Sequence, residues 1–235
     1  MHTQKLKIAG LTVEICCESD FSRLFEPYTC SGQADISVGT SAAEITYEQG
    51  RFPALTARSA EFCLLYAKIC DELPRFDAFL LHAAVLEYNG MAYAFCAKSG
   101  TGKSTHAELW CSLPDKGCRI INGDKPIIRI TDGIPNAFGT PWNGKEGRGE
   151  NISAPLAGIG FIVRDDIPSV RQTDKKEGLF RVLSASHRPK EHSLDDHFYQ
   201  CVGQVAKTVP MYELKCNVSA DAAKTAFEAM TGEML

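Results

Sequence analysis

The residues with the most specific chemistry in this chain are Ala97–Ser104, which read AKSGTGKS. They follow the P-loop (Walker A) pattern G-x-x-x-x-G-K-[ST], except that alanine replaces the first glycine. In such a loop, successive backbone N–H groups and the positive end of the following helix bind polyphosphate. The nucleotide-binding residues that this pattern predicts are Ser99, Gly100, Thr101, Gly102, Lys103, Ser104 and Thr105.

The pattern also assigns individual roles. Lys103 is expected to reach the β- and γ-phosphates, and Ser104 to hold Mg²⁺. ATP with Mg²⁺, or with Mn²⁺ in its place, is therefore the expected cofactor pair, although the phosphate motif does not distinguish ATP from GTP. A flexible Gly/Ser/Thr turn is the alternative interpretation, but a turn does not need GKS at its end.

Asp124 is the best candidate for a carboxylate facing the phosphates. It follows the P-loop after one helix-compatible run and one apolar strand, Arg119–Asn122. At that strand end Asp124 could hold Mg²⁺, or accept a proton from a substrate hydroxyl as a general base. The alternative is a turn, because Asn122–Pro126 reads NGDKP.

The glycine-rich loop Gly139–Gly149 carries two cations, Lys145 and Arg148. Separated glycines with cations indicate a mobile phosphate clamp, and we place Lys145 ahead of Arg148 in that role. The alternative is a solvated charged loop. Trp142 in the same loop could stack on a ligand or anchor the loop in the core.

Other ionisable residues allow a structural and a functional interpretation. A lone histidine beside apolar residues, such as His82, is usually a core residue. Lys98 and His106 flank the P-loop and could touch either phosphate or only solvent. The acidic pairs Asp165–Asp166 and Asp195–Asp196 are typical of a turn and a helix start.

The P-loop needs a strand before it and a helix after it. The apolar run Met91–Cys96 and the run Ser104–Trp110 supply them, and Asn89–Gly90 predicts a hairpin that leads into the strand. Apolar residues at helical spacing predict a helix over 57–73. Short strands are predicted in the β-rich N-terminal part at 7–15, 34–38 and 44–47.

The C-terminal half continues this alternation of strands and helices. Strands are predicted at 127–130, 135–138, 156–163 and 211–216, and helices near 194–209 and 219–231. The run at 156–163 is nearly continuously apolar, as in strands buried on both faces. We therefore predict an α/β fold with a central mixed sheet. Residues 1–75 form an N-terminal region packed on a P-loop core of residues 76–235.

Composition limits the class of protein. The 235 residues carry a net charge of −4 without a long basic run, so nucleic acid is not an expected partner. No apolar stretch approaches the roughly 18 residues of a membrane span, and the first residues lack the apolar core of a signal peptide. We expect a cytoplasmic protein without a membrane partner. Its ten cysteines, none in a C-x-x-C pair, are expected to be reduced and mostly buried.

The run His82–Val85, then Asn89–Gly90, then Phe95–Ser104 resembles the catalytic core of HPr kinase/phosphorylase and its small bacterial relatives. That family shares the P-loop fold variant of phosphoenolpyruvate carboxykinase. A histidine opens the strand before its hairpin, and His82 matches that position. An acidic pair ends its next strand, but here Gly123 stands beside Asp124, so only Asp124 matches.

The resemblance implies ATP-dependent phosphorylation of a hydroxyl, most plausibly a serine of a peptide or small protein. It implies Asp124 as the base, with His82 assisting and Lys145 steadying the transferred charge. It also implies an oligomer and leaves a phosphorylase reaction open. Two alternatives remain: a small-molecule kinase, and a nucleotide-binding regulator that never transfers phosphate.

Overall fold

The computed structural model describes residues 1–113 and 117–235. Within this part of the chain, the N-terminal residues form a small sheet in the order β1-β2-β3. Its strands are β1 (His2–Ile8), β2 (Leu11–Cys17) and β3 (Ile36–Gly39). β1 and β2 form an antiparallel hairpin, and β3 lies parallel to β2.

Helices pack beside this small sheet. They are α1 (Ser22–Phe25), α2 (Ala42–Arg51) and α3 (Ala57–Glu72), with 3₁₀ turns at η1 (Glu26–Tyr28) and η2 (Leu73–Phe76). The strand predicted at 44–47 is wrong, because these residues lie inside α2. Ser41 accepts a hydrogen bond from the Glu44 N–H, and the Glu44 carboxylate accepts one from the Ser41 N–H. This capping box fixes a helix start that outweighs the local β-propensity.

A large mixed sheet forms the centre of the molecule. In the described ranges it consists of β4 (Ala78–Leu80), β5 (Ala83–Tyr88), β6 (Met91–Cys96), β7 (Arg119–Asn122), β8 (Ile127–Thr131), β9 (Ile134–Phe138), β10 (Ser153–Arg164), β11 (Ser169–Gln172) and β12 (Met211–Cys216). The strand order is β4-β8-β9-β10-β6-β5-β7, and β12 pairs with β10 and β11. The predicted α/β fold with a central mixed sheet is confirmed.

The long strand β10 joins the parallel and antiparallel parts of this sheet. Its first residues pair antiparallel with β9, and the remainder lies parallel between β6 and β12. Ile159 is fully buried, as the apolar run predicts for a central strand. Since β6, β10 and β12 run in the same direction, their carboxyl ends meet at one edge, where open α/β sheets bind ligands.

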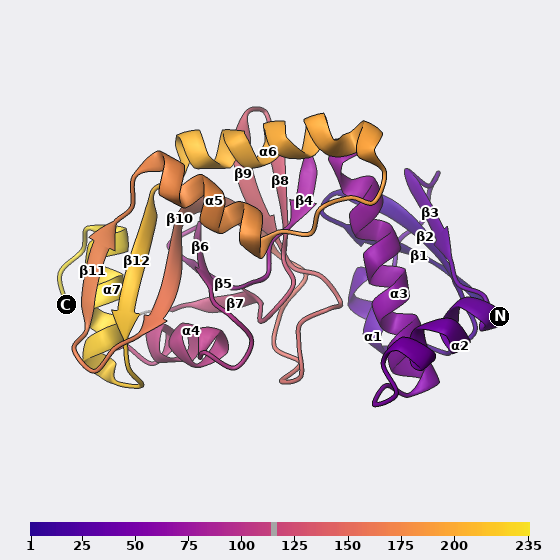
Figure 1. Cartoon of the computed structure of the whole chain (residues 1–235), viewed down its shortest axis with the longest axis horizontal. Helices are drawn as coiled ribbons and strands as arrows, with labels where there is room; N and C mark the ends of the chain where they lie inside the picture. Colours follow the sequence, from indigo (N-terminus) through magenta and orange to yellow (C-terminus); the bar gives the residue numbers. More distant parts are fainter. Residues whose placement is uncertain (114–116) are drawn as a thin grey trace.

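Two helices cover each face of the central sheet (Figure 1). They are α4 (Lys103–Cys111) and α7 (Ala220–Thr231) on one face, and α5 (Lys175–Ala185) and α6 (Asp195–Thr208) on the other, with η3 (His192–Leu194) just before α6. Trp110 and Phe227 fill the core under α4 and α7, and Phe198 lies in the core under α6. The helices predicted near 194–209 and 219–231 are therefore present, whereas α5 is an element that the sequence analysis missed.

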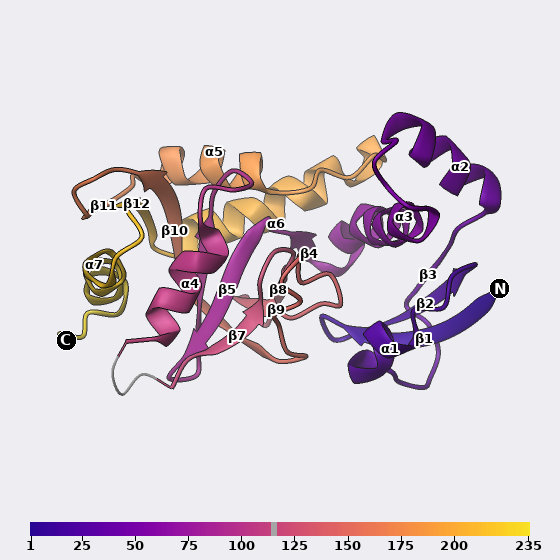
Figure 2. The same cartoon turned by 90° about the horizontal axis from the view of Figure 1, so that it is seen from below.

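The N-terminal sheet and α1–α3 lie at one end of the molecule, and the C-terminus lies at the other (Figures 1 and 2). Leu65 of α3, Leu80 of β4 and Trp142 share one hydrophobic core, which connects this end to the central sheet. Arg129 Nη1 adds a 2.9 Å hydrogen bond to the carbonyl oxygen of Ala9. The division of the chain after residue 75 stays a prediction. Among the described helices, none is long and apolar enough to cross a membrane.

Candidate functional site

The P-loop follows β6 and runs directly into α4, so the strand–loop–helix order of the motif is present. Gly100 and Gly102 take φ of +75° and +118°, which other residues rarely adopt. In the described chain the non-glycine residues with positive φ are Ala9, Asp77, Asn89 and Asp132. Ala97 is not among them, so alanine at the first position of the motif causes no left-handed backbone strain.

Lys103 is the first residue of α4 and is only 7% exposed. Its Nζ lies 3.0 Å from His82 Nε2, 3.4 Å from the carbonyl oxygen of Ala97 and 3.9 Å from Asp124 Oδ1. Burial lowers the pKa of Lys103, and the Asp124 carboxylate acts in the opposite direction. The ammonium therefore lies at the base of the P-loop with its charge only partly compensated by the protein.

His82 stands between β4 and β5, where the chain passes the P-loop lysine. Burial, and then the ammonium groups of Lys103 and Lys125, lower its pKa below the ordinary value. An ammonium only donates, so His82 Nε2 accepts the bond from Lys103 and a neutral ring carries its proton on Nδ1. Nδ1 lies 3.3 Å from Asp124 Oδ1, at ion-pair distance but without hydrogen-bond alignment.

Asp124 follows β7 and faces both groups. Its Oδ2 also lies 3.1 Å from Nζ of Lys125, a residue that the sequence analysis did not single out. The three predicted residues Lys103, His82 and Asp124 are thus brought together at one strand edge. The Lys125 ammonium also lies 5.7 Å from the centre of the Tyr66 ring on α3.

Asn122 positions Asp124 and was also missed by the sequence analysis. It is fully buried, and its Oδ1 accepts hydrogen bonds from the N–H groups of Asp124 (2.9 Å) and Lys125 (2.6 Å). Its Nδ2 donates to the carbonyl oxygen and to Oγ1 of buried Thr140, at 3.2 and 3.0 Å. NGDKP is therefore a turn, and the turn fixes the direction of the Asp124 backbone. A role for Asp124 in a site stays a prediction.

Gly123 occupies the position where the resembled family has a second acid. A Cβ at residue 123 would lie 2.9 Å from the carbonyl oxygen of Asn143 and 3.1 Å from that of Arg148. The glycine-rich loop therefore fills the space that a second carboxylate would need. The same loop contacts Asp124, since a Cβ at Gly144 would lie 2.9 Å from Asp124 Cβ.

This loop closes one side of the predicted phosphate site. A cavity of about 380 Å³ is lined by Ser99, Gly100, Gly102, Lys103, Ser104, Thr105, Gly123, Asp124, Asn143, Gly144, Lys145 and Glu146. Lys145 is exposed at its rim, whereas Arg148 pairs with Glu108 of α4 at 2.7 Å. Trp142 is buried and donates from Nε1 to the carbonyl oxygen of Phe62 at 2.9 Å. It anchors the loop to the core.

Ser104 and Asp124 provide the oxygen ligands that Mg²⁺ would need. Both line the same cavity, and Ser104 Oγ lies 3.5 Å from the carbonyl oxygen of Gly123. Mg²⁺ commonly takes only one or two protein ligands and completes its shell with substrate phosphates and water. The residues fit that ion. In the described residues, no group of three or more His, Cys, Asp and Glu side chains gathers into a larger metal site.

A second, larger hollow of about 710 Å³ lies on the other side of His82. Its lining is mainly apolar and includes Leu80, Phe161 and Phe180. Its cations are Lys98, Lys125 and Arg181. His82 therefore lies between this hollow and the phosphate cavity, in contact with Lys103 and Asp124. This hollow is not evident from the sequence, because part of its wall comes from α5, a helix that the sequence pattern does not predict.

His106 lies elsewhere than predicted. It is only 3% exposed and packs edge-on against Phe95, with 4.8 Å between ring centres. It therefore does not face bulk solvent, and it does not line the cavity of the predicted phosphate site. The acidic pairs lie at a turn and a helix start, as predicted: Asp165 follows β10 and pairs with Lys215 at 3.0 Å, and Asp195 begins α6 and pairs with Arg188.

No family model and no curated protein matches this chain. Among solved structures, the chain is similar to the Hpr(Ser) kinase/phosphatase from Coxiella burnetii. The two share 12% sequence identity with a TM-score of 0.38, over 65% of this chain and 88% of that chain. The function proposed below rests on the geometry of this chain's own residues.

Proposed function

We propose that this chain is a phosphotransferase that uses ATP and Mg²⁺ to phosphorylate a hydroxyl group. The single observation that carries the proposal is the convergence of Lys103, His82 and Asp124 beside the P-loop, within 4 Å of one another. A structural turn would not need a buried lysine, a neutral histidine and a carboxylate at one strand end. Phosphoryl transfer needs a phosphate cradle, a cation and a group that orients the nucleophile.

The phosphates would lie over the N-terminus of α4. Six of the seven predicted P-loop residues, all but Thr101, line that cavity, and buried Lys103 brings a positive charge to its base. Ser104 and Asp124 would hold the Mg²⁺ ion, which when bound neutralises charge on the phosphate oxygens. Lys145 at the rim would contact the transferred phosphoryl group from the opposite side.

Asp124 would accept the proton of the attacking hydroxyl. The acceptor oxygen forms a bond to the γ-phosphorus while the bond to the β,γ-bridging oxygen breaks, leaving ADP and a phosphate ester. The proton from the hydroxyl goes to Asp124 Oδ1, which lies beside His82 Nδ1. Neutral His82 faces this carboxylate with Nδ1 and adds no positive charge of its own beside it.

The hollow next to His82 supports an acceptor that approaches from that side. A serine of a peptide or small protein could enter there with an apolar neighbouring side chain against Phe161 and Phe180. The volume of about 710 Å³ also suits a small apolar metabolite with a hydroxyl group, which keeps a small-molecule kinase as the second candidate. Gly123 in place of a second acid favours the third candidate, a nucleotide-binding regulator without transfer.

Nucleotide titration calorimetry with Mg²⁺ tests the phosphate cradle. Wild type should bind ATP, and Lys103→Ala should lose binding, whereas Lys98→Ala should bind normally because Lys98 is exposed and outside the cavity. Equal binding by wild type and Lys103→Ala would contradict the proposal. Transfer of label from [γ-³²P]ATP to a serine-containing peptide library, compared with a pool of hydroxylated metabolites, separates the two kinases. ATP binding without transfer to either would favour the regulator.

A further inference from the structure

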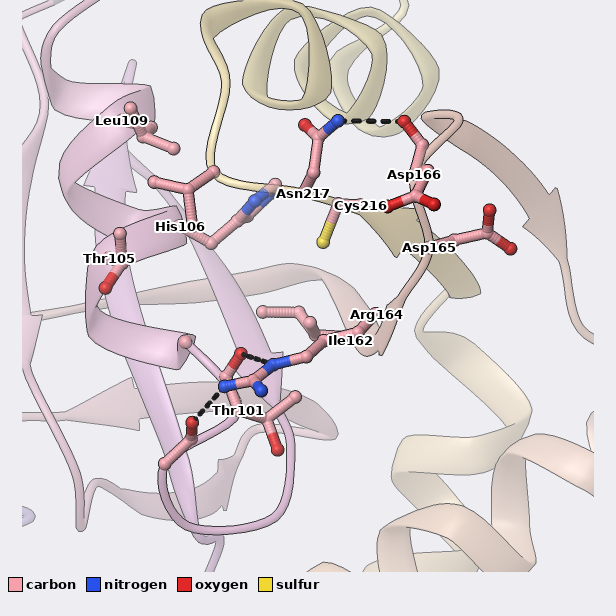
Figure 3. Close-up of a pocket in the computed structure, with 13 residues that line it drawn as sticks. Thr101, Thr105, His106, Leu109, Ile162, Arg164, Asp165, Asp166, Cys216 and Asn217 are labelled. Atoms are coloured by element: carbon pink, nitrogen blue, oxygen red, sulfur yellow. Dashed lines mark hydrogen bonds between the residues drawn. The ribbon is translucent and has the colours of Figure 1, made fainter.

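A third cavity lies on the side of α4 away from Asp124. It measures about 580 Å³ and lies between α4 and the carboxyl ends of β10 and β12 (Figure 3). It shares Gly100, Gly102 and Thr105 with the phosphate cavity, so the two spaces adjoin along the P-loop. A ligand with its phosphates in one cavity can therefore extend into the other around the first turn of α4.

The strand topology favours this side for the rest of a nucleotide. The cavity lies at the edge where the parallel strands β6, β10 and β12 end. In open α/β sheets, ligands bind outside the carboxyl ends of such strands. Arg164, the last residue of β10, donates to the carbonyl oxygens of Gly100 (2.5 Å) and Thr101 (3.3 Å) and so joins this wall to the P-loop.

His106 gives the cavity an unused hydrogen-bonding group. Its ring points from α4 toward Asn217 and Cys216, as Figure 3 shows, and both ring nitrogens are buried without a hydrogen-bond partner. Burial lowers the pKa of His106 to about 4, so the ring is neutral and offers one donor and one acceptor. Buried polar groups normally have partners, so these two ring nitrogens can bond a ligand that enters the cavity.

The rest of the lining fits an uncharged ring system better than further phosphates. Leu109 and Ile162 provide apolar surface, and the Asn217 side chain donates to the carbonyl oxygen of Asp166. Asp165 and Asp166 also line the cavity, and their carboxylates would repel phosphate. Arg164 already binds the loop carbonyls, and Asp165 pairs with Lys215. A base and ribose match this mixture of apolar surface and polar atoms.

We propose that this cavity binds the nucleoside part of the triphosphate and that His106 hydrogen-bonds to it. The inference rests on the proposed nucleotide site but names a separate subsite. Inorganic tripolyphosphate distinguishes the phosphate site from the nucleoside subsite, because it carries the phosphates without the nucleoside. Of ATP and GTP, the nucleotide that wild type binds more tightly should also bind more tightly than tripolyphosphate does.

The informative variant is His106→Phe, which keeps a ring of similar size and removes both hydrogen-bonding atoms. It should weaken nucleotide binding about tenfold while tripolyphosphate binding stays unchanged. His106→Asn, which restores a donor and an acceptor, should recover part of the loss. His197→Phe, at an exposed histidine on α6, is the matched control and should change neither affinity.

A direct readout uses the NMR signal of the His106 ring. Nucleotide should shift that signal in wild type, and tripolyphosphate should not. Unchanged nucleotide affinity in His106→Phe would overturn the inference. An equal loss of affinity for nucleotide and tripolyphosphate would also overturn it, because the substitution would then have disturbed the P-loop that binds both. Wild type that binds tripolyphosphate and nucleotide equally well would overturn the nucleoside subsite but leave the phosphate cradle intact. Binding of neither would overturn the proposed function itself.

Discussion

The ammonium group of Lys103 donates a 3.0 Å hydrogen bond to Nε2 of His82. This contact links the residue that would bind phosphate to the residue that faces Asp124, the proposed general base. Because the ammonium has only donors, it holds His82 in the tautomer with its proton on Nδ1, toward Asp124. Replacing Lys103 should therefore alter the surroundings of the Asp124 carboxylate, because the His82 ring contacts both residues.

The first prediction concerns the pKa of His82. After burial, the Lys103 charge is the largest cause that lowers this pKa, so Lys103→Met should raise it, while the remaining burial keeps it below the ordinary value. An NMR titration of the His82 ring measures the shift. Lys98→Met removes an exposed lysine outside these contacts and should leave the titration of His82 as in wild type. An unchanged His82 pKa in Lys103→Met would contradict the contact.

The second prediction separates nucleotide binding from transfer. Asp124→Asn removes the proton acceptor but keeps the shape of the side chain. Turnover should drop by about 10² or more, the usual scale for a lost general base. ATP affinity should fall much less, because the Asn side chain keeps an oxygen that can still bind Mg²⁺. Steady-state kinetics and calorimetry on the same variant measure both quantities. Normal turnover would exclude Asp124 as the base.

The sequence predicts those parts of the site that are encoded by residues close together along the chain. The P-loop is a contiguous motif, so its residues and its strand–loop–helix setting follow from AKSGTGKS and its flanks. Asp124 follows from its place after the next apolar strand. Both predictions need only the order of elements along the chain.

The missed residues act through contacts between distant parts of the chain. Asn122 positions Asp124 by bonding to Thr140, and Gly123 is required by the carbonyl oxygens of Asn143 and Arg148. His106 is a cavity residue only because β10 and β12 end beside α4. Neither α2 nor α5 was predicted. In α2 a capping box outweighs a short run of β-formers, and α5 carries Gly178, a poor helix former, in its first turn.

The third prediction tests the packing of the loop on the strand end. Gly123→Ala places a Cβ 2.9 Å from the carbonyl oxygen of Asn143, so the loop must move. The free energy of unfolding should fall by about 1–3 kcal/mol, as in other overpacked sites, and ATP affinity should fall with it. Urea denaturation measures the first quantity and calorimetry the second.

Gly203→Ala is the matched control for this substitution. Gly203 lies within α6 and a Cβ there meets nothing within 4 Å. The replacement should therefore stabilise the protein by roughly 0.5–1 kcal/mol through helix propensity, without any effect on ATP. A Gly123→Ala variant as stable as wild type would show that the loop has room to spare above Gly123.

The last prediction is a pH dependence of stability caused by His106. In the unfolded chain this ring takes up a proton near pH 6.5, but in the folded protein only near pH 4. Between these values the unfolded state binds more protons, so the free energy of unfolding rises with pH and falls on acidification. The pKa difference corresponds to about 3 kcal/mol of the free energy of unfolding. This contribution is present in full above pH 6.5 and is lost as the pH falls toward 4.

His106→Phe removes that ionisation together with two buried atoms that lack partners. Its free energy of unfolding, relative to wild type, should therefore increase as the pH is lowered from 7 to 4.5, as measured by urea denaturation. The same measurement on His197→Phe, which removes an exposed histidine of α6, is the matched control. If His106→Phe is more stable than wild type but binds nucleotide more weakly, the imidazole is retained for the ligand rather than for the fold. Equal pH dependence in wild type and His106→Phe would mean that the ring is hydrated and takes up its proton without unfolding.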